Sequence, residues 1–227
     1  MPDISLHYIE QGQGLPLILL HGNGESCDYF EHQIPCFATE YRVIAIDSRG
    51  HGQSPRGEKP FTIKQFAEDL HDFMDAHDIG NAILLGFSDG GNIALTFALK
   101  YPDRVEKLIL NGANLFPSGV KARYQWPIEF GYRIAKLFSK KSEEAKQNTE
   151  MLSLMVNEPH IDPSELARLT MPVLVVAGTK DMIKDEHTRL IYKSLPNAQL
   201  AILEGDHFVA NKNYVAFNSA VQAFLKE

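Results

Sequence analysis

Short runs of β-branched residues and leucine alternate along the chain with longer segments of helical period. Most of these runs are too continuously apolar for strands that face water on one side, so they are expected inside a sheet covered on both faces. The alternation predicts an α/β fold, with a mostly parallel central sheet and helices on both of its faces. The expected strands are residues 4–9, 17–20, 43–46, 83–85, 108–110, 173–177 and 200–203.

Three segments between and after these strands are the clearest helices. Residues 62–77 carry apolar side chains at three- and four-residue spacing with polar ones between them, as in a surface helix packed on a sheet. Residues 92–100 are more apolar throughout, which favours a helix buried against the sheet, and Pro102 ends it. The last helix is expected at residues 214–225.

Residues 113–171 break the alternation because they contain no convincing strand. The helices expected in this stretch are residues 120–138, residues 142–156 and one that begins at Asp162 and Pro163. At 227 residues, the chain is long enough for one large domain with an insertion. We therefore predict an α/β core of residues 1–112 and 172–227 and an inserted helical cap of residues 113–171.

The overall charge argues against nucleic acid as the main partner. The formal net charge is -7, whereas binding to phosphates needs a concentrated basic surface. A solvated helix face is the favoured explanation for the basic residues that gather in one stretch, namely Lys121, Arg123, Arg133, Lys136, Lys140 and Lys141. A small-molecule substrate is the expected partner, and the sequence carries no signal for the oligomeric state.

The amino terminus lacks the basic start and the apolar run of a signal peptide, and no segment approaches ~18 apolar residues. A cytoplasmic protein without membrane association is therefore expected. Its two cysteines, Cys27 and Cys36, are too few for a disulfide framework or a structural zinc site. Both are expected to be free thiols.

The sharpest local feature is a Gly-x-Ser-x-Gly motif, Gly86 to Gly90, between an apolar strand and a helix. A serine hydroxyl is a weak nucleophile, so a reactive serine needs an exposed tight turn where a base can reach its proton. Gly86 and Gly90 suit such a turn because a side chain at either position would crowd the strand-to-helix crossing. Ser88 is therefore the expected nucleophile, and a role only as a cap of the following helix is less favoured.

Three further features, taken with this motif, resemble the α/β-hydrolase family in type and order. His-Gly-Asn-Gly at residues 21–24 resembles the oxyanion loop. Residues 47–54 are similar to the family's Asp-x-Arg-Gly-x-Gly-x-Ser stretch. Residues 178–181 and 205–208 resemble the loops that carry the catalytic acid and histidine. The resemblance covers essentially the whole chain outside the cap and implies the α/β-hydrolase fold and a serine hydrolase.

His207 is the best candidate for the base, because it alone of nine histidines lies in a loop just after a late strand, downstream of the nucleophile and an acid. Asp181 follows the strand at 173–177 and is the candidate that orients the ring. The resulting chain order of Ser, Asp and His is the one expected for this fold. The loop after the strand at 108–110 has no carboxylate and therefore offers no alternative to Asp181 as the catalytic acid.

We expect the other histidines and acids near these loops to have structural rather than catalytic roles. His187 is expected in a surface helix, His7 lies far from any expected strand carboxyl end, and His21 and His51 are expected to satisfy backbone groups in tight loops. Asp185 and Glu186 suit the first turn of a helix, where acidic side chains favour the helix dipole. Asp206 adjoins His207 and cannot easily turn back to orient its ring.

The resemblance places the oxyanion hole at the backbone N–H groups of Asn23 and Asp89. Asp89 also makes the motif nearest to a Gly-x-Ser-Asp-Gly-Gly subgroup that includes amino-acid ester hydrolases, in which the acid contacts a substrate's cationic amine through residues beyond the motif. Capping of the following helix is the favoured alternative for Asp89. Trp126 belongs to an aromatic-rich part of the cap that is either a small core or the wall of a substrate pocket.

These residues predict hydrolysis of a carboxylic ester, small or aminoacyl, through an acyl-enzyme that needs no cofactor. No metal set with usable spacing is recognisable. Thioesterase, amidase, C–C hydrolase, lyase and perhydrolase activities stay open on the same triad, as does a hydrolase-like ligand receptor with slow turnover. Compared with the family, the first edge strand is short or missing. The modest cap suggests a shallow site, for a small acyl group or for a large substrate that protrudes.

Overall fold

Residues 3–227 are described by a computed structural model, in which seven strands form one sheet. The strands are β1 (Tyr8–Gln11), β2 (Pro16–Leu20), β3 (Arg42–Ile46), β4 (Ala82–Phe87), β5 (Val105–Asn111), β6 (Val173–Gly178) and β7 (Ala198–Leu203). Their order across the sheet is β1-β3-β2-β4-β5-β6-β7. Only β1 runs antiparallel to its neighbour, and the other pairs are parallel, so the predicted mostly parallel α/β fold is confirmed.

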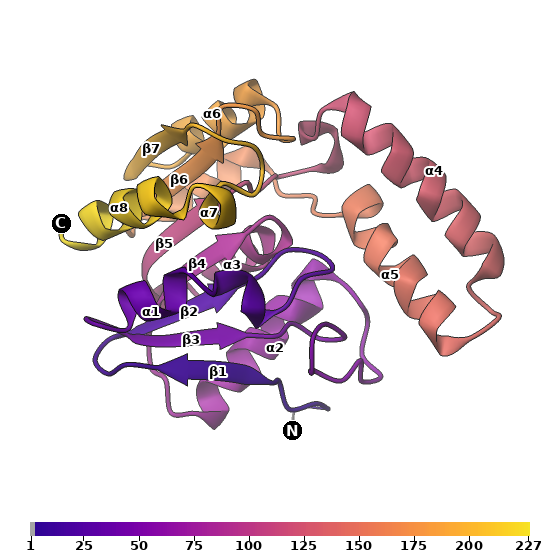
Figure 1. Cartoon of the computed structure of the whole chain (residues 1–227), viewed down its shortest axis with the longest axis horizontal. Coiled ribbons are helices and arrows are strands. Elements are labelled where there is room, and N and C mark those ends of the chain that lie inside the picture. Colours follow the sequence, from indigo (N-terminus) through magenta and orange to yellow (C-terminus); the bar gives the residue numbers. More distant parts are fainter. Residues whose placement is uncertain (1–2) are drawn as a thin grey trace.

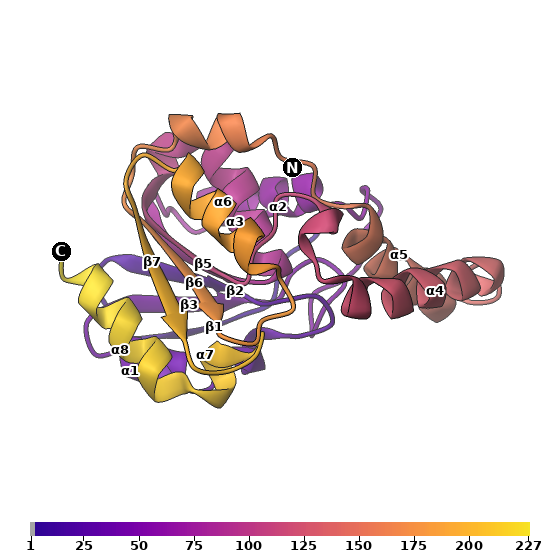
Figure 2. The ribbon, with the colours of Figure 1, turned by 90° about the horizontal axis from the view of Figure 1, so that it is seen from above.

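Helices cover both faces of this sheet (Figures 1 and 2). The helices within residues 3–227 are α1 (Gln33–Phe37), α2 (Ile63–Ala76), α3 (Asp89–Lys100), α4 (Ala122–Phe138), α5 (Glu143–Asn157), α6 (Asp185–Ser194), α7 (Val209–Lys212) and α8 (Tyr214–Leu225). Apolar side chains of α2, α3 and α6 form one buried cluster with one face of the sheet. Those of α1, α7 and α8 form a second cluster with the other face.

Burial explains why the central strands could be recognised. Every residue of β4 and of β6 is buried, as expected for continuously apolar strands inside a sheet covered on both faces. β7 lies at the sheet edge and has no fully buried residue. The two core clusters therefore fix the middle of the sheet more strongly than its edges.

The predicted first strand is wrong in its bounds, because pairing begins only at Tyr8. The segment before it is held by the loop that follows β3. The backbone N–H of His7 donates to Oγ of Ser54 at 2.8 Å, and its carbonyl accepts from the N–H of Asp47 at 2.9 Å. Apolar Ile4 and Leu6 suggested a strand, but their backbone lies beyond the end of the partner strand.

Helices α4 and α5 lie side by side and stand off the sheet in both views (Figures 1 and 2). We call them the α4–α5 hairpin. Both were predicted close to their observed bounds, and Oγ of Ser142 caps α5 by accepting from the N–H of Ala145. The third expected helix is instead a 3-10 segment, Pro163–Arg168, capped by Asp162. The division into core and cap stays a prediction, and residues 1 and 2 of that core lie outside the described residues.

None of the helices within residues 3–227 combines the length and the apolar character needed to cross a membrane. Cys27 and Cys36 are both free thiols, as expected.

Candidate active site

Three side chains from the carboxyl ends of different strands meet at one edge of the sheet. Ser88 follows β4, Asp181 follows β6 and His207 follows β7. The Oγ atom of Ser88 lies 3.0 Å from Nε2 of His207. The other ring nitrogen, Nδ1, lies 2.7 Å from Oδ1 of Asp181. The three residues chosen from the sequence therefore form one continuous hydrogen-bonded chain.

The turn that carries Ser88 is strained and crowded. Ser88 has φ of 53° and ψ of -119°, a conformation that L-residues rarely adopt and that costs about 1–3 kcal/mol. A Cβ at Gly86 would clash with the carbonyl of Gly90, and one at Gly90 would clash with the carbonyl of Leu20. The hydroxyl of Ser88 caps no backbone N–H of α3. The helix-cap alternative for Ser88 is therefore wrong, since the hydroxyl faces the imidazole instead.

Asp181 is held as a buried carboxylate. Its Oδ1 accepts from the N–H of Ile183 at 2.9 Å, and its Oδ2 accepts from the N–H of Gly178 at 3.3 Å. Burial raises the pKa of Asp181, but the hydrogen bond and charge of His207 and these two N–H groups lower the pKa by more, so it lies below its ordinary value. The carboxylate is thus kept ionised beside the ring.

The neighbouring acids face elsewhere. Asp206 accepts from the N–H of Phe208 and pairs with Lys212, so its carboxylate does not reach the ring of His207. Asp185 lies in the first turn of α6 and pairs with Arg189. Both observations agree with the roles inferred from the sequence.

Gly112 is a residue of this site that sequence reasoning missed. It follows β5 with φ of 65°, and a Cβ there would stand 2.7 Å from Cε1 of His207. The imidazole ring of His207 also contacts the ring of Phe87, and the two ring centroids lie 5.0 Å apart. The Asn-Gly pair after an apolar strand was the available signal, but it did not reveal what the glycine would face.

The loop at residues 21–24 lies against the nucleophile, because a Cβ at Gly22 would be 3.2 Å from Cβ of Ser88. Within residues 3–227, the backbone N–H groups of Asn23 and Asp89 donate to no acceptor. Asp89 begins α3, so its N–H has no partner inside the helix. The two donors predicted for the oxyanion hole therefore flank Ser88 and are free.

His21 and His51 bond to backbone groups, as expected. Nε2 of His21 accepts from the N–H of Ser48 at 2.9 Å, so its Nδ1 donates to the carbonyl of Gly22 at 2.7 Å. Burial, aided by the charge of His51, lowers the pKa of His21 to about 4. A ring that is neutral and fully engaged in this way supports the loop rather than the chemistry.

The expectations for two other histidines are wrong. His187 lies on α6 but is buried, and its Nε2 accepts from the N–H of Leu115 at 2.9 Å. Its polar ring is inside because the loop after β5 folds over α6, a contact that helical period alone does not show. His7 lies beside a strand carboxyl end, with Nδ1 2.8 Å from Oδ2 of Asp47.

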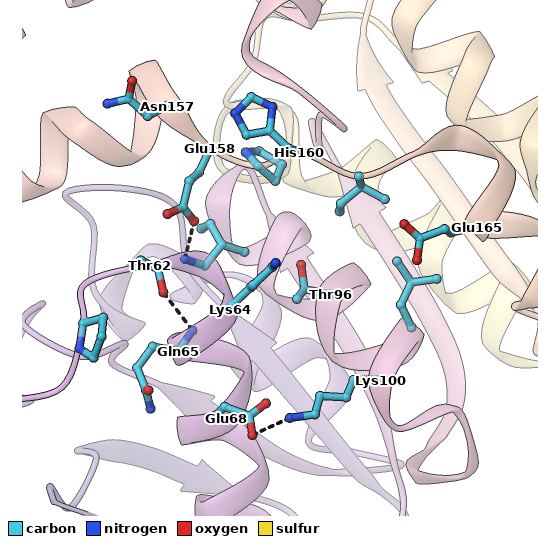
Figure 3. A pocket seen from close by; sticks show the side chains of 15 residues that line it. Thr62, Lys64, Gln65, Glu68, Thr96, Lys100, Asn157, Glu158, His160 and Glu165 are labelled. Carbon is cyan, nitrogen blue, oxygen red and sulfur yellow. Dashed lines mark hydrogen bonds and ion pairs between the residues drawn. The ribbon is translucent and has the colours of Figure 1, made fainter.

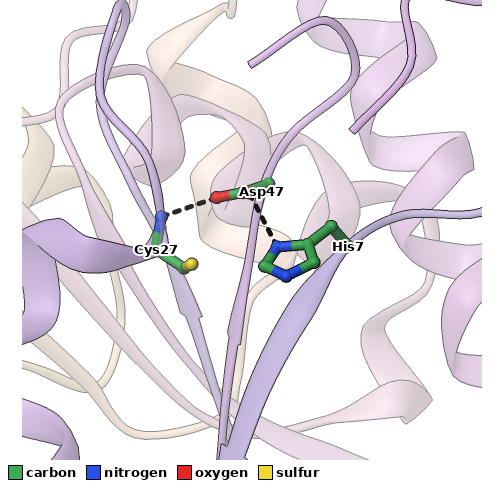
Figure 4. A group of neighbouring side chains, drawn as sticks. All are labelled: His7, Cys27 and Asp47. Carbon is green, nitrogen blue, oxygen red and sulfur yellow. Dashed lines mark hydrogen bonds and ion pairs between the residues drawn. The ribbon is translucent and has the colours of Figure 1, made fainter. Parts of the chain in front are cut away.

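His7, Asp47 and Cys27 form a cluster whose ligand-type atoms all lie within 4.8 Å of one another (Figure 4). The sequence did not indicate this set, because its members come from three separate segments. Oδ1 of Asp47 accepts from the N–H of Cys27 and Oδ2 from the N–H of Gln53. Burial, with Asp47 beside it, raises the pKa of the Cys27 thiol to about 12. A neutral thiol and an engaged carboxylate suit a hydrogen-bonded cluster better than a metal site.

A small cavity of about 30 Å³ adjoins Ser88 and is lined by Asp89, by Gln125 of α4 and by Glu158 at the end of α5. The carboxylate of Asp89 accepts from Nδ2 of Asn23 at 2.9 Å and from Nδ2 of Asn92 at 3.1 Å. Gln125 and Glu158 were missed in the sequence, since nothing there shows which side of the α4–α5 hairpin faces the serine.

Neither alternative for Trp126, the small core of the cap or the wall of a substrate pocket, is supported. Its side chain is on the outer side of α4 and is 72% exposed, and it is absent from the lining of the cavity beside Ser88. The neighbouring Gln125 and Ile128 line that cavity instead. The aromatic residues in the sequence therefore indicated the helix that borders the cavity, but not the face of that helix that lines it.

A larger cavity of about 750 Å³ lies between α2, α3 and the segment after α5 (Figure 3). Its lining contains neither Ser88 nor His207, so its size does not make it the reaction site. Glu158 borders both cavities, and its Oε2 accepts from the N–H of Ile63 at 2.7 Å. Glu158 thus forms a wall between the small cavity and the large one.

Comparisons with known proteins agree with this geometry. The model of the alpha/beta hydrolase fold family matches residues 16–143. The human serine hydrolase BPHL is 28% identical, over 98% of this chain and 84% of its own length. The 3-oxoadipate enol-lactonase 2 of Acinetobacter baylyi is 27% identical, over 99% of this chain and 94% of its own.

A 1-acylglycerol-3-phosphate O-acyltransferase of Arabidopsis thaliana is 36% identical over 52% of this chain, but the match spans only 30% of that relative's length. Among solved structures, a hydrolase from Pseudomonas aeruginosa is similar with a TM-score of 0.82 and 25% identity. That similarity covers 99% of this chain and 95% of the other.

The family model covers more than half of the chain. Asp181 and His207 lie beyond the matched residues, yet they meet Ser88 in space at the carboxyl edge of the sheet. The similarity in fold to the Pseudomonas aeruginosa hydrolase covers nearly the whole chain, well beyond the residues that the family model matches. The chain therefore belongs to the α/β-hydrolase fold family and is a hydrolase of that family.

Proposed function

We propose that the chain is a serine hydrolase that cleaves carboxylic esters through an acyl-enzyme, with Ser88, His207 and Asp181 as its catalytic triad. The observation that carries this proposal is the strained serine, with Oγ 3.0 Å from an imidazole whose other nitrogen lies 2.7 Å from a buried carboxylate. Such an arrangement activates a hydroxyl that would otherwise be a weak nucleophile.

The proposed reaction has two halves. Nε2 of His207 takes the proton of Ser88 as Oγ attacks the ester carbonyl, and the N–H groups of Asn23 and Asp89 stabilise the resulting oxyanion. The imidazolium then gives its proton to the departing alkoxide, which leaves an acyl-enzyme. A water molecule, deprotonated by the same nitrogen, attacks the acyl-enzyme, and this nitrogen returns the proton to Oγ of Ser88 as the acid is released. Asp181 holds Nδ1 protonated throughout and stabilises the imidazolium.

Two of the relatives support an ester substrate, whereas others are named an epoxide hydrolase and a meta-cleavage product hydrolase. One relative is named a serine hydrolase and another an enol-lactonase, which acts on a cyclic ester. Thioesters, amides, C–C bonds and lyase or perhydrolase chemistry can use the same triad, so they are separated by assay rather than by fold. A hydrolase-like receptor with slow turnover is the alternative outside catalysis.

The cavity beside Ser88 supports a short acyl group that carries an ammonium. Burial raises the pKa of Asp89, and burial together with the charge of Asp89 raises the pKa of Glu158. Within residues 3–227, the buried Oε1 of Gln125 has no hydrogen-bond partner. Two carboxylates and an unpaired amide oxygen around a space of about 30 Å³ suit one group with three N–H donors. We therefore place this chain nearest the Gly-x-Ser-Asp-Gly-Gly subgroup.

The predicted division also becomes part of this proposal. Residues 113–171 are assigned as the cap, because Gln125 and Glu158 from this segment close the cavity over Ser88. Residues 1–112 and 172–227 are assigned as the core that carries the triad.

A burst assay tests the proposed function. Stopped-flow hydrolysis of p-nitrophenyl acetate should show one p-nitrophenolate released rapidly per protein molecule, followed by a slower steady rate, because acylation precedes deacylation. Ser88→Ala should remove the burst and lower kcat by about 10⁴ or more. Ser219→Ala, on the exposed face of α8, serves as the matched control. Turnover no faster than that of Ser88→Ala on all esters tested would instead support a receptor.

A further inference from the structure

One side of α4 exposes a stripe of large apolar side chains. The exposed fractions are 72% for Trp126, 66% for Phe130, 42% for Ile134 and 79% for Leu137. Spacings of four, four and three residues place these side chains on the same side of the helix. We call these four residues the α4 stripe. Contiguous apolar surface of this kind marks an interaction site on a water-soluble body.

The other side of α4 is already occupied. Gln125 is buried, and together with Ile128 it lines the cavity beside Ser88. Helix α5 packs against the same side, and the hairpin stands at the outside of the molecule (Figures 1 and 2). Within residues 3–227, no element covers the α4 stripe. The stripe therefore cannot be explained as part of the hairpin's own core.

Basic side chains without acidic partners surround the stripe. Residues 121–141 hold six basic side chains and one acidic one, in a chain whose formal net charge is -7. Among the described residues, no carboxylate comes within ion-pair distance of the exposed Arg123, Arg133, Lys136, Lys140 and Lys141. Three of them lie only over neighbouring rings, as Lys141 does at 4.3 Å from the centroid of Phe138. These five cations are free to meet external negative charge.

We propose that the α4 stripe and its surrounding basic residues bind the surface of an anionic lipid bilayer. Trp, Phe and Leu on one face of a helix flanked by Lys and Arg are the features of a helix that lies in the plane of a membrane interface. Negatively charged headgroups supply the partners that these cations lack. A second copy of the chain fits less well, since it would bring the same positive surface against itself.

This surface is separate from the ester-hydrolase proposal but adjacent to its site. The side of α4 opposite the stripe lines the cavity beside Ser88. A helix with its side chains is about 10–12 Å across, so binding through the stripe brings that cavity near the lipid headgroups. The sequence-based expectation of a protein without membrane association rested on the lack of a spanning segment, and surface binding needs none.

Trp126 is the only tryptophan in the chain, and its fluorescence reports on the stripe directly. With vesicles of phosphatidylglycerol and phosphatidylcholine in equal parts, we expect a blue shift of the emission and protection from an aqueous quencher. Phosphatidylcholine vesicles alone should cause neither change, and added salt should reverse both. An unchanged spectrum with the anionic vesicles would overturn the proposal.

Paired variants separate the two contributions. Phe130→Ser with Leu137→Ser, and Arg133→Gln with Lys136→Gln and Lys140→Gln, should each weaken vesicle binding about tenfold or more. Val215→Ser and Lys226→Gln, exposed at the other end of the molecule, should leave it unchanged. Hydrolysis of a soluble ester should persist in all of them. A blue shift that depends on protein concentration and not on vesicles, with a dimer in sedimentation velocity, would assign the stripe to a second copy instead.

Discussion

Gly112 faces the imidazole of His207 so closely that a Cβ on this glycine would stand 2.7 Å from Cε1 of the ring. Gly112→Ala should push the ring away from Ser88 and strain a backbone with φ of 65°. We expect labelling by a phosphonate to slow about 10²-fold and stability to fall by about 1–2 kcal/mol. Gly131→Ala is the matched control, because a Cβ there meets nothing within 4 Å. Labelling of Gly112→Ala at the wild-type rate would show that the ring does not depend on this contact.

Asp181→Asn tests the orientation of the base. An amide at this position keeps the shape but can donate to Nδ1 of His207, which favours the wrong tautomer and leaves the imidazolium without its carboxylate. We expect kcat to fall by roughly 10⁴. Stability should fall by about 1–3 kcal/mol, because an amide nitrogen cannot accept from the buried N–H group of Ile183 or Gly178. Asp206→Asn removes the adjacent carboxylate, which bonds to Phe208 and Lys212, and should retain nearly full activity. If Asp206→Asn loses more activity than Asp181→Asn, the assignment of the acid is wrong.

Asp89→Asn tests the ammonium site. We expect the ratio of kcat/KM for an alanine ester over the matching propionate ester to fall about tenfold or more, because an amide gives no charge to pair with the ammonium. Glu158→Gln should lower the same ratio, and Asp185→Asn, an exposed acid of α6, should not. If the ratio is unchanged in both Asp89→Asn and Glu158→Gln, the ammonium site is wrong, but the ester-hydrolase proposal is unaffected.

The same ratio should depend on pH. Burial raises the pKa of Asp89 above the ordinary 3.8, so its carboxylate becomes protonated at a higher pH than an exposed aspartate does. As the pH falls through this raised pKa, the charge that holds the ammonium disappears. We therefore expect the preference for the alanine ester to be full at neutral pH and to be lost on the acid side, with a midpoint above 3.8. A preference that is constant down to that pH would contradict the role of Asp89.

His187 should make the fold sensitive to acid. Burial, aided by Lys184, lowers its pKa from 6.5 to about 4, so between these pH values the unfolded chain binds a proton that the folded chain does not. The contribution of His187 to the free energy of unfolding should therefore decrease as the pH falls from about 6.5 to about 4, by on the order of 3 kcal/mol. Urea titrations at several pH values should show a flatter profile for His187→Gln, and the wild-type profile for His160→Gln on the surface. Parallel profiles for wild type and His187→Gln would contradict this assignment.

The fold was predictable where burial is uniform. β4 and β6 are apolar at every position because helices cover both of their faces, and such strands are visible in a single sequence. β1 was misplaced because its neighbouring residues are held by side chains of the loop after β3, such as Ser54. Contacts between distant segments of this kind leave no periodic pattern.

Within the site, the three triad residues were found because each follows an apolar strand, and parallel strands bring their carboxyl ends together. Gly112, Gln125 and Glu158 were missed, since their roles depend on how loops and helices pack around His207 and Ser88. Helical period located α4 but did not show that Gln125, rather than Trp126, turns inward. The outward turn of Trp126 is also what revealed the α4 stripe.

The most direct test of the proposed chemistry is the position at which a fluorophosphonate reacts with the intact chain. We expect peptide mass spectrometry to find one adduct, on Ser88, and none in Ser88→Ala under the same conditions. Asp181→Asn should label far more slowly than wild type. A wild-type chain that stays unlabelled, or a Ser88→Ala variant that labels equally well, would contradict the assignment of Ser88 as the nucleophile.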